Sequence, residues 1–561
     1  MMSRFLCLTI LVLYCNTPSL AILPFDPDLK VPTTFGVVQG TDLEESYGFL
    51  GIPFGKPPTG ALRYTEPQPP EPWTDILPVE KYPPGCIQKC AEPPDACPTE
   101  ISEDCLYLNV WTPKRNLSSD GLHPVFMFMH GGNFRDGAGG VPLYDGRYLA
   151  EYADTVIVTI NYRLEVFGWL YLGNVTDPDS GDDYPLANLG LKDQRLAMKF
   201  IYENIEQFGG DPNRITISGQ SAGAQSVGFH LMSPESDPYF QQAIMFSNPF
   251  ALPYKTPPDA FEMADIFASE LGCPPRNLSC FRSRSATETL DASRETTTQV
   301  INPREILQFF EQWNPTVGEG EFPEEILEAY AMGHFQRKPI MLGTLIEEGV
   351  LFIYSIFGEP MTQAQYRAVL RVAARDFTRD ALQQYPPELQ GDQREILSKV
   401  TTDYIFMCPT MNVSRIFNEL GHNEVFHFLL DAVWSFEEGW TDGFSMCYGR
   451  SCHGGDLPYI FRTAPLGGYS FTDEETNLIN DMSSYLGNFF HNANPNVPKS
   501  EEMRAKQPPH IPYWPKFNEK PESSYSLLYS LCGTSVYSNY GSDLCPLMDS
   551  FGYYKRSPLN F

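Results

Sequence analysis

The chain has 561 residues and a formal net charge of −31 at pH 7, from 70 acidic and 39 basic side chains. This charge argues against nucleic acid and anionic membranes as partners, because both would repel the protein. The length would suit several domains, but no Gly/Ser linker, charge block or repeat divides the sequence. We therefore expect one domain over residues 22–561, since large α/β enzymes reach this size around one sheet.

Residues 1–21 have the pattern of a secretory signal peptide. A positive charge at Arg4 precedes an apolar run from Phe5 to Tyr14, and Ser19-Leu20-Ala21 offers small residues at a cleavage site. The run is too short to span a bilayer comfortably, although a short membrane anchor is the alternative. No later stretch is long enough for a transmembrane helix. We expect cleavage near Ala21 and a protein that is secreted or lies in the lumen of the secretory pathway.

The first half of the mature chain contains the earliest predicted strands. Residues 33–52 alternate and carry several glycines, which predicts short antiparallel strands. Three runs of apolar residues follow, and each predicts a buried strand: 105–111, 125–129 and 155–160. Strands that are apolar on both faces are typical of a parallel sheet covered by helices.

Strands and helices alternate through the rest of the chain. Residues 191–208 have helical periodicity and lead into a strand predicted at 214–218. Further buried strands are predicted at 242–247, 339–343 and 425–430. This alternation predicts an α/β core with a large, mostly parallel central sheet flanked by helices on both faces. Residues 250–336 and 361–406 are expected to lie over this core as helices and loops.

The cysteines fit an oxidising compartment. Eleven of the 13 follow residue 21, because Cys7 and Cys15 belong to the signal peptide. Local pairing would give five disulfides and leave Cys408 free: two within Cys86, Cys90, Cys97 and Cys105, then Cys273–Cys280, Cys447–Cys452 and Cys532–Cys545. Spacing does not fix connectivity, and a zinc site is the alternative for the first cluster. Four glycosylation sequons fit the same compartment: Asn116, Asn174, Asn277 and Asn412.

A G-x-S-x-G motif, Gly219 to Gly223, directly follows the strand predicted at 214–218. A serine at this spacing fits a strained strand-to-helix turn that exposes its hydroxyl in a cleft. The glycines are needed because larger side chains would collide where strand and helix nearly touch. Residues 222–232 are largely small and apolar, as expected of a helix behind the turn. About 0.2 chance matches are expected in a chain of this length, so further catalytic groups are required.

The other parts of a serine nucleophile site occur at the ends of predicted strands. A serine hydroxyl needs an imidazole as base, a carboxylate that orients the imidazole, and backbone N–H groups for the oxyanion. Residues 130–134 (HGGNF) follow one strand, 344–349 (TLIEEG) follow another, and 452–456 (CHGGD) lie downstream. Serine, acid and histidine therefore occur in the chain order expected for this sheet topology.

These motifs resemble the type B carboxylesterase and cholinesterase family of α/β-hydrolases. The matching stretches keep the family's order: 62–64, 102–111, 130–134, 188–194, 208–223, 347–349 and 453–457. The resemblance implies an α/β-hydrolase fold and a nucleophile, acid and base at Ser221, Glu348 and His453. It implies oxyanion donors at the backbone N–H groups of Gly132, Asn133 and Ala222, and neither a metal nor an organic cofactor.

The same resemblance implies structural pairs. Cys105, Cys273 and Cys280 match positions that the family uses for disulfides. Arg63 with Glu103, and Arg163 with Asp193, resemble its buried ion pairs.

Some alternatives stay open. Glu347 could replace Glu348 as the acid, since only one of them can face the histidine. His130, His230 and His427 are interpreted as structural. Asp456 is interpreted as a turn or cap group.

The sequence departs from the family pattern at three positions. Asn133 stands at the third glycine of the oxyanion loop, where its N–H remains while its side chain narrows the acyl site or adds a donor. Asp95 stands where cholinesterases carry a tryptophan that binds quaternary ammonium, which argues against choline ester specificity. Gln220 stands where glutamate is commoner.

The sequence therefore predicts a secreted serine esterase that hydrolyses small-molecule carboxylic esters through an acyl-enzyme. The alternative is a catalytically silent adhesion, binding or storage protein of the same fold, because function depends on the site. A lipase with a lid is a third hypothesis. The acyl and alcohol specificity and the oligomeric state are left open.

Overall fold

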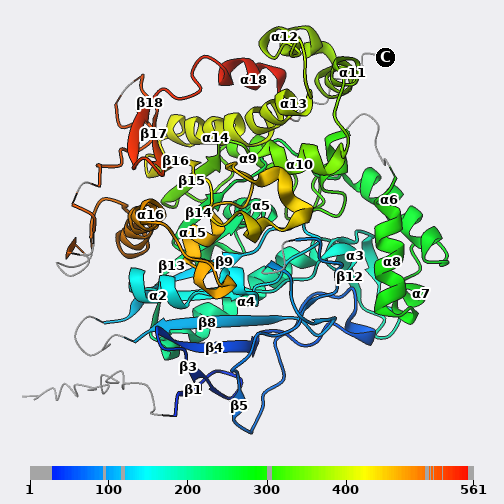
Figure 1. The fold of residues 1–561 in the computed structure, drawn as a ribbon. Helices are drawn as coiled ribbons and strands as arrows, with labels where there is room; N and C mark the ends of the chain where they lie inside the picture. The colour runs from blue at the N-terminus through cyan, green and yellow to red at the C-terminus, as the bar shows by residue number, and fades with distance from the viewer. Residues whose placement is uncertain are drawn as a thin grey trace, which may run out of the picture.

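The computed structural model describes residues 28–92, 96–114, 121–299, 306–498, 504–505, 507–509, 511–520 and 522–553 (Figure 1). The signal peptide, Asp95 and the sequon at Asn116 lie outside the described residues. The boundaries of the signal peptide and of a single domain therefore stay predictions.

The described residues form a sheet of 11 strands in the order β18-β17-β16-β15-β14-β13-β9-β10-β8-β4-β3. The run from β17 to β10 is parallel throughout. Its strands are β17 (Tyr525–Ser530), β16 (Val425–Asp431), β15 (Ile340–Leu345), β14 (Gln242–Phe246), β13 (Gly210–Gln220), β9 (His123–Met129) and β10 (Val156–Ile160). The mostly parallel sheet is confirmed.

The two edges of the sheet are antiparallel. One edge is β18 (Ser535–Ser538), and the other is formed by β8 (Tyr107–Pro113), β4 (Ser46–Pro53) and β3 (Thr41–Asp42). The strand predicted at 105–111 is thus buried as expected, but it pairs antiparallel with both β10 and β4. The pattern of apolar residues indicates that a strand is buried but not whether it runs parallel or antiparallel to its neighbours, which explains the difference.

Two helical layers bury the sheet. Along β9, the side chains of Val125, Met127 and Met129 pack in one core cluster, and those of Phe126 and Phe128 pack in the other. The first cluster lies under α4 (Leu189–Asn204), α5 (Ala222–Met232) and α14 (Cys408–Glu419), and the second under α2 (Arg147–Ala153), α15 (Leu457–Phe461) and α16 (Asp473–Asn492) (Figure 1). Successive side chains of a strand point to opposite faces, so a strand between two cores is apolar throughout.

The elements around the G-x-S-x-G motif agree with the prediction. The helix expected at 191–208 consists of α4 and a final 3₁₀ turn, Ile205–Phe208. Strand β13 begins at Gly210, earlier than predicted, and its register shifts between Gly210 and Ile215. Helix α5 covers the expected residues 222–232.

The two covering segments consist of helices and loops, as predicted (Figure 1). The first contains α6 (Pro257–Glu270), α7 (Leu278–Ser283), α8 (Ala286–Thr296) and α9 (Ile326–Ala331). The second follows α10 (Gly349–Ile356) and contains α11 (Gln363–Ala374), α12 (Thr378–Gln384), α13 (Arg394–Thr401) and a π-helical turn, Thr402–Met407. The first segment follows the carboxyl end of β14 and the second follows β15 and α10, at the edge of a parallel sheet where α/β proteins bind their ligands.

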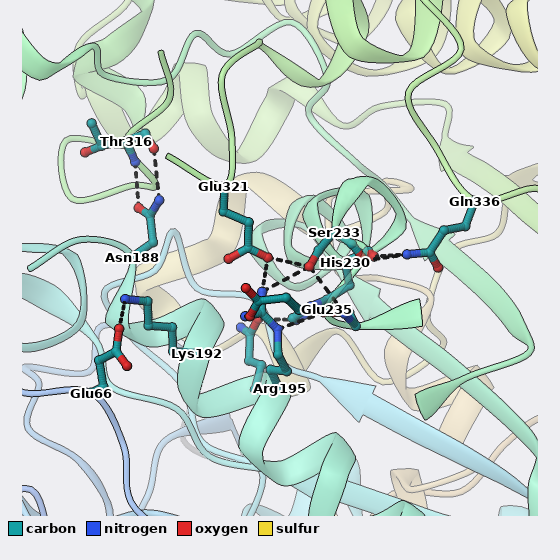
Figure 2. A network of polar contacts seen from close by, with 12 residues as sticks. Glu66, Asn188, Lys192, Arg195, His230, Ser233, Glu235, Thr316, Glu321 and Gln336 are labelled. Atoms are coloured by element: carbon teal, nitrogen blue, oxygen red, sulfur yellow. Dashed lines mark hydrogen bonds and ion pairs between the residues drawn. The ribbon is translucent and has the colours of Figure 1, made fainter. Parts of the chain in front are cut away.

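Polar contacts fix the first covering segment to α4 and to the end of α5 (Figure 2). Arg195 on α4 donates to Ser233 Oγ at 3.1 Å, and Glu321 of the covering segment binds both residues. Asn188 and Thr316 exchange two hydrogen bonds of 2.9 and 2.8 Å. Charge-assisted bonds of this kind hold the loop in one position relative to α5.

Both ion pairs implied by the family resemblance are present. Arg63 binds Glu103 with two bonds of 2.5 and 2.6 Å, and Arg163 binds Asp193 with bonds of 2.8 and 2.7 Å. Both arginines are buried and engage the carboxylates in the bidentate geometry that suits guanidinium.

The disulfide prediction is partly wrong. The structure pairs Cys86–Cys105, Cys90–Cys97, Cys273–Cys280 and Cys447–Cys452, so the zinc alternative fails for the first cluster. Cys408 is not free, because it pairs with Cys545 over 137 residues. Among the described cysteines, Cys532 alone has no disulfide partner, and it is exposed. The packing of α14 against α18 (Cys545–Phe551) brings Cys408 and Cys545 together, and local spacing gives no sign of that contact.

Within the described part of the chain, no helix has the length and apolar character needed to cross a membrane.

The Cys408–Cys545 bond supplies a stability prediction. Replacing both residues with serine should lower the free energy of unfolding by about 2–5 kcal/mol, because the unfolded chain regains the entropy of a long loop. Urea denaturation followed by circular dichroism measures this change. Cys532→Ser is the matched control and should change stability by less than about 0.5 kcal/mol. Peptide mapping that finds a Cys532–Cys545 link would contradict the pairing.

Candidate active site

Ser221 lies in the turn between β13 and α5, with φ 57° and ψ −125°. A Cβ on Gly219 would lie 2.2 Å from the Gly223 carbonyl carbon, and a Cβ on Gly223 would lie 2.0 Å from the Met129 oxygen. Both glycines are therefore required by the close approach of strand and helix, as predicted. The backbone of Ser221 is in a sparsely populated conformation, which is common where a side chain is held for function.

Glu348 follows β15 and is fully buried. Its Oε1 accepts the Leu345 N–H at 2.8 Å, and its Oε2 lies 2.6 Å from His453 Nδ1. The carboxylate is thus fixed by a backbone donor on one oxygen and contacts the imidazole with the other. An acid in this position orients an imidazole and stabilises its charged form.

Glu347, the alternative acid, points elsewhere. Its Oε2 accepts the Ser451 N–H at 2.9 Å, and its Oε1 lies 3.5 Å from Arg450 Nη1. Its backbone also bridges Cys452. These contacts hold the histidine loop against the end of β15, so the geometry favours Glu348 as the partner of His453.

His453 follows the Cys447–Cys452 disulfide and packs against two aromatic rings that stack on each other. The centroids of Phe352 and Phe406 lie 5.0 and 5.1 Å from the imidazole centroid. Phe352 belongs to α10 and Phe406 to the π-helical turn, a feature that often occurs at functional sites. The packing of these two rings and the contact with Glu348 together restrict the orientation of the imidazole.

The other ring nitrogen of His453 contacts a residue that the sequence did not single out as a partner. Gln220 Nε2 lies 3.0 Å from His453 Nε2. Ser221 and His453 line the same cavity, but among the described residues the hydrogen-bond partner of Nε2 is Gln220.

The predicted oxyanion loop follows β9. Gly132 and Asn133 both have positive φ, 93° and 54°. Asparagine is among the few non-glycine residues that tolerate this region, which explains why it can replace the third glycine. The N–H groups of Gly132 and Asn133 have no backbone partner in the described part of the chain. Ala222 is the first residue of α5, where the N–H has no partner within a helix.

Ser221, His453, Gly132 and Asn133 line one cavity of about 120 Å³. Four aromatic residues, which we call the aromatic wall, line it as well: Trp434, Phe436, Trp440 and Tyr469. Trp434 stacks on Trp440 with centroids 4.1 Å apart, and Phe436 stacks on Tyr469 at 5.2 Å. Sequence reasoning missed this wall, although the density of aromatic residues between 434 and 444, just before His453, could have indicated it.

Carboxyl groups surround the imidazole beyond Glu348. Burial raises the pKa of Asp456 to about 7, and the charge of Glu348 acts in the same direction. Burial likewise raises the pKa of Glu92, which lines the cavity, and of Glu311 to about 7 each. Asp456 stands at the N-cap position of α15, which agrees with its interpretation as a cap group, although its side chain makes no capping hydrogen bond.

The three histidines interpreted as structural do not line the cavity. His230 lies between Ser236 Oγ at 2.9 Å and Gln194 Oε1 at 3.0 Å, at the end of α5 that Figure 2 shows. His130 contacts the Gly131 oxygen at 2.9 Å, and His427 contacts Ser526 Oγ at 2.8 Å. Burial lowers the pKa of His230 and His427 to about 3 and that of His130 to about 4. These contacts agree with structural roles.

Over the described residues, no group of three or more His, Cys, Asp and Glu side chains is arranged to hold a metal ion.

Comparison with known proteins places this geometry in a family. The sequence matches the carboxylesterase family over residues 27–543. It is 33% identical over 533 residues to the Crystal protein of Dictyostelium discoideum, covering 94% of this chain and 92% of that protein. It is 30% identical over 541 residues to an acetylcholinesterase of Bungarus fasciatus, covering 89% and 85%. The structure of a thermophilic PNB esterase is similar with a TM-score of 0.75 and 27% identity, covering 92% of this chain and 99% of that one.

The family match includes every predicted site residue and the whole described sheet. It agrees with the resemblance inferred from the motifs, and the similar esterase structure agrees with the predicted architecture. The chain belongs to the carboxylesterase family and has the α/β-hydrolase fold.

Proposed function

We propose that the protein is a serine esterase that hydrolyses small carboxylic esters through an acyl-enzyme. The observation that carries the proposal is the meeting of Ser221, His453 and the loop at Gly132 in one cavity, with Glu348 2.6 Å from the imidazole. These groups supply a nucleophile, a base, an orienting acid and oxyanion donors, which acyl transfer requires together.

The reaction uses these groups in two half-steps. His453 takes the proton of the Ser221 hydroxyl while the serine oxygen attacks the ester carbonyl. The backbone N–H groups of Gly132, Asn133 and Ala222 stabilise the oxyanion of the tetrahedral intermediate. The imidazolium then protonates the departing alcohol, and water releases the acid by the same route in reverse. Glu348 stabilises the imidazolium in both half-steps.

Secretion forms part of the proposal. The disulfides of the structure suit an oxidising compartment, and the sequons at Asn174 and Asn277 are exposed. Asn412 is half-buried within α14. These features, together with the predicted signal peptide, support export of the protein.

A catalytically silent role is the second candidate. The Crystal protein and the acetylcholinesterase are similar to this chain over comparable lengths, so similarity alone does not separate a silent protein from an enzyme. The presence of Ser221, His453 and the loop at Gly132 at one cavity, with Glu348 beside the imidazole, favours the enzyme, because silent members of a fold have no need to retain these groups.

Ser221→Ala tests the nucleophile. The variant should hydrolyse p-nitrophenyl acetate about 10⁴- to 10⁶-fold more slowly than the parent, since no other group can form the acyl-enzyme. Ser226→Ala, on α5 beyond the turn that holds Ser221 and outside the cavity lining, is the matched control and should keep most of the activity. Equal rates for the parent and Ser221→Ala would refute the assignment.

Paired substitutions separate the two neighbouring acids. Glu348→Gln should lower kcat/KM by about 10³- to 10⁴-fold, because the imidazole loses the charge that stabilises its protonated form. Glu347→Gln should lower it less than about tenfold, since that side chain binds Arg450 and Ser451 instead. Steady-state kinetics on one ester measures both variants. A larger loss in Glu347→Gln than in Glu348→Gln would reverse the assignment.

A further inference from the structure

The contact between Gln220 and His453 fixes the protonation pattern of the imidazole. His453 Nδ1 lies 2.6 Å from a carboxylate oxygen of Glu348, which can only accept when ionised, so Nδ1 carries the proton. In the neutral ring, Nε2 is then an acceptor, and the Gln220 amide 3.0 Å away donates to it.

Gln220 donates its hydrogen bond to the Nε2 lone pair of His453, and the same lone pair must accept the proton of Ser221 during attack. Neutral imidazole has one acceptor nitrogen, so the amide of Gln220 and the hydroxyl of Ser221 compete for it. Gln220 and Ser221 are consecutive residues at the end of β13 and both line the cavity. Exchange between them therefore needs only a side-chain movement within the cavity.

We propose that Gln220 is a positioning residue, which holds His453 in the neutral Nδ1–H form in the resting protein and yields Nε2 to Ser221 during attack. The inference rests on the proposed function, because it assigns to Gln220 the task of keeping the general base His453 unprotonated at Nε2. It adds a residue whose role is distinct from the triad and the oxyanion loop.

The carboxyl groups near His453 explain why an amide suits this position. Four of them interact with the imidazole from different elements: Glu348 after β15, Glu92 in the Cys90–Cys97 loop, Glu311 after the 3₁₀ turn at 306–310, and Asp456 before α15. Each ionised carboxylate favours the imidazolium, which cannot act as a base. A further carboxylate at 220 would add to this effect at the shortest range, whereas the amide donor favours the neutral ring.

The residues around the Gln220 amide restrict the position of this side chain. A Cβ on Gly131 would lie 2.7 Å from Gln220 Oε1, so the absence of a side chain at 131 provides the space for the amide. The side chain is 4% exposed. A glutamate has nearly the same shape and fits this space, so it changes the charge and the donor without changing the packing.

The test follows the titration of His453 by NMR in histidine-labelled protein, with the signal assigned from a His453→Gln variant. Gln220→Glu should raise the titration midpoint by about one pH unit, and Gln220→Met, which only removes the donor, by about half a unit. Ser221→Ala should shift the midpoint less than Gln220→Met does, because the partner of Nε2 is Gln220. Gln384→Glu, an exposed substitution on α12 with the same change in net charge, is the matched control and should have no effect.

Two results would overturn the inference. One is a titration midpoint of His453 in Gln220→Glu that equals that of the parent protein. The other is a larger midpoint shift in Ser221→Ala than in Gln220→Met, which would mean that Ser221 is the partner of Nε2 in the resting protein. The NMR measurement does not depend on turnover. A lack of esterase activity would therefore contradict the proposed function, while the titration of His453 would still test the role of Gln220. If the protein is active, the acid limb of its kcat/KM profile should move to higher pH in Gln220→Glu by the same amount as the midpoint.

Discussion

The close contact between the backbones of β13 and α5 is the constraint on which the candidate site depends. Gly219 and Gly223 leave no room for a Cβ, so the chain can pass from strand to helix only through the strained turn that presents Ser221. The same contact sets the distance from α5 to the end of β9, because a Cβ on Gly223 would touch the Met129 oxygen. The first residue of α5 therefore lies beside the loop that follows β9.

The parallel sheet brings the remaining groups to this point. The carboxyl ends of parallel strands lie at one edge of the sheet, where α/β proteins bind their ligands. β9 leads to Gly132, β13 to Ser221, β15 to Glu348, and the segment after β16 to His453. Residues more than 200 positions apart in the sequence thus meet without any long-range signal between them, since strand order alone positions them.

Much of the site could be predicted from the sequence because each part has a local pattern. The turn at Ser221, the glycine-rich loop and the helix at 222–232 follow from the spacing of small and apolar residues, and the parallel strands follow from uninterrupted apolar runs. The features that were missed depend on distant contacts. The Cys408–Cys545 bond needs the docking of α18 on α14, and the direction of β8 needs its pairing with β4. The Gln220 contact with His453 joins residues 233 positions apart.

Family membership alone does not decide what the protein does. The relatives include an acetylcholinesterase and a protein named for crystals, and both are similar to this chain over most of its length. The decision therefore rests on the site, where function resides. Here the site combines a strained serine, a histidine packed against Phe352 and Phe406, and an aromatic wall.

The most direct test of the central claim is covalent labelling of the folded protein with an organophosphate, read by intact mass and peptide mapping. Labelling should give one adduct per chain, located on Ser221, and should fall strongly in His453→Ala because the serine then has no base. A folded protein that stays unlabelled, or that carries its adduct on another residue, would contradict it.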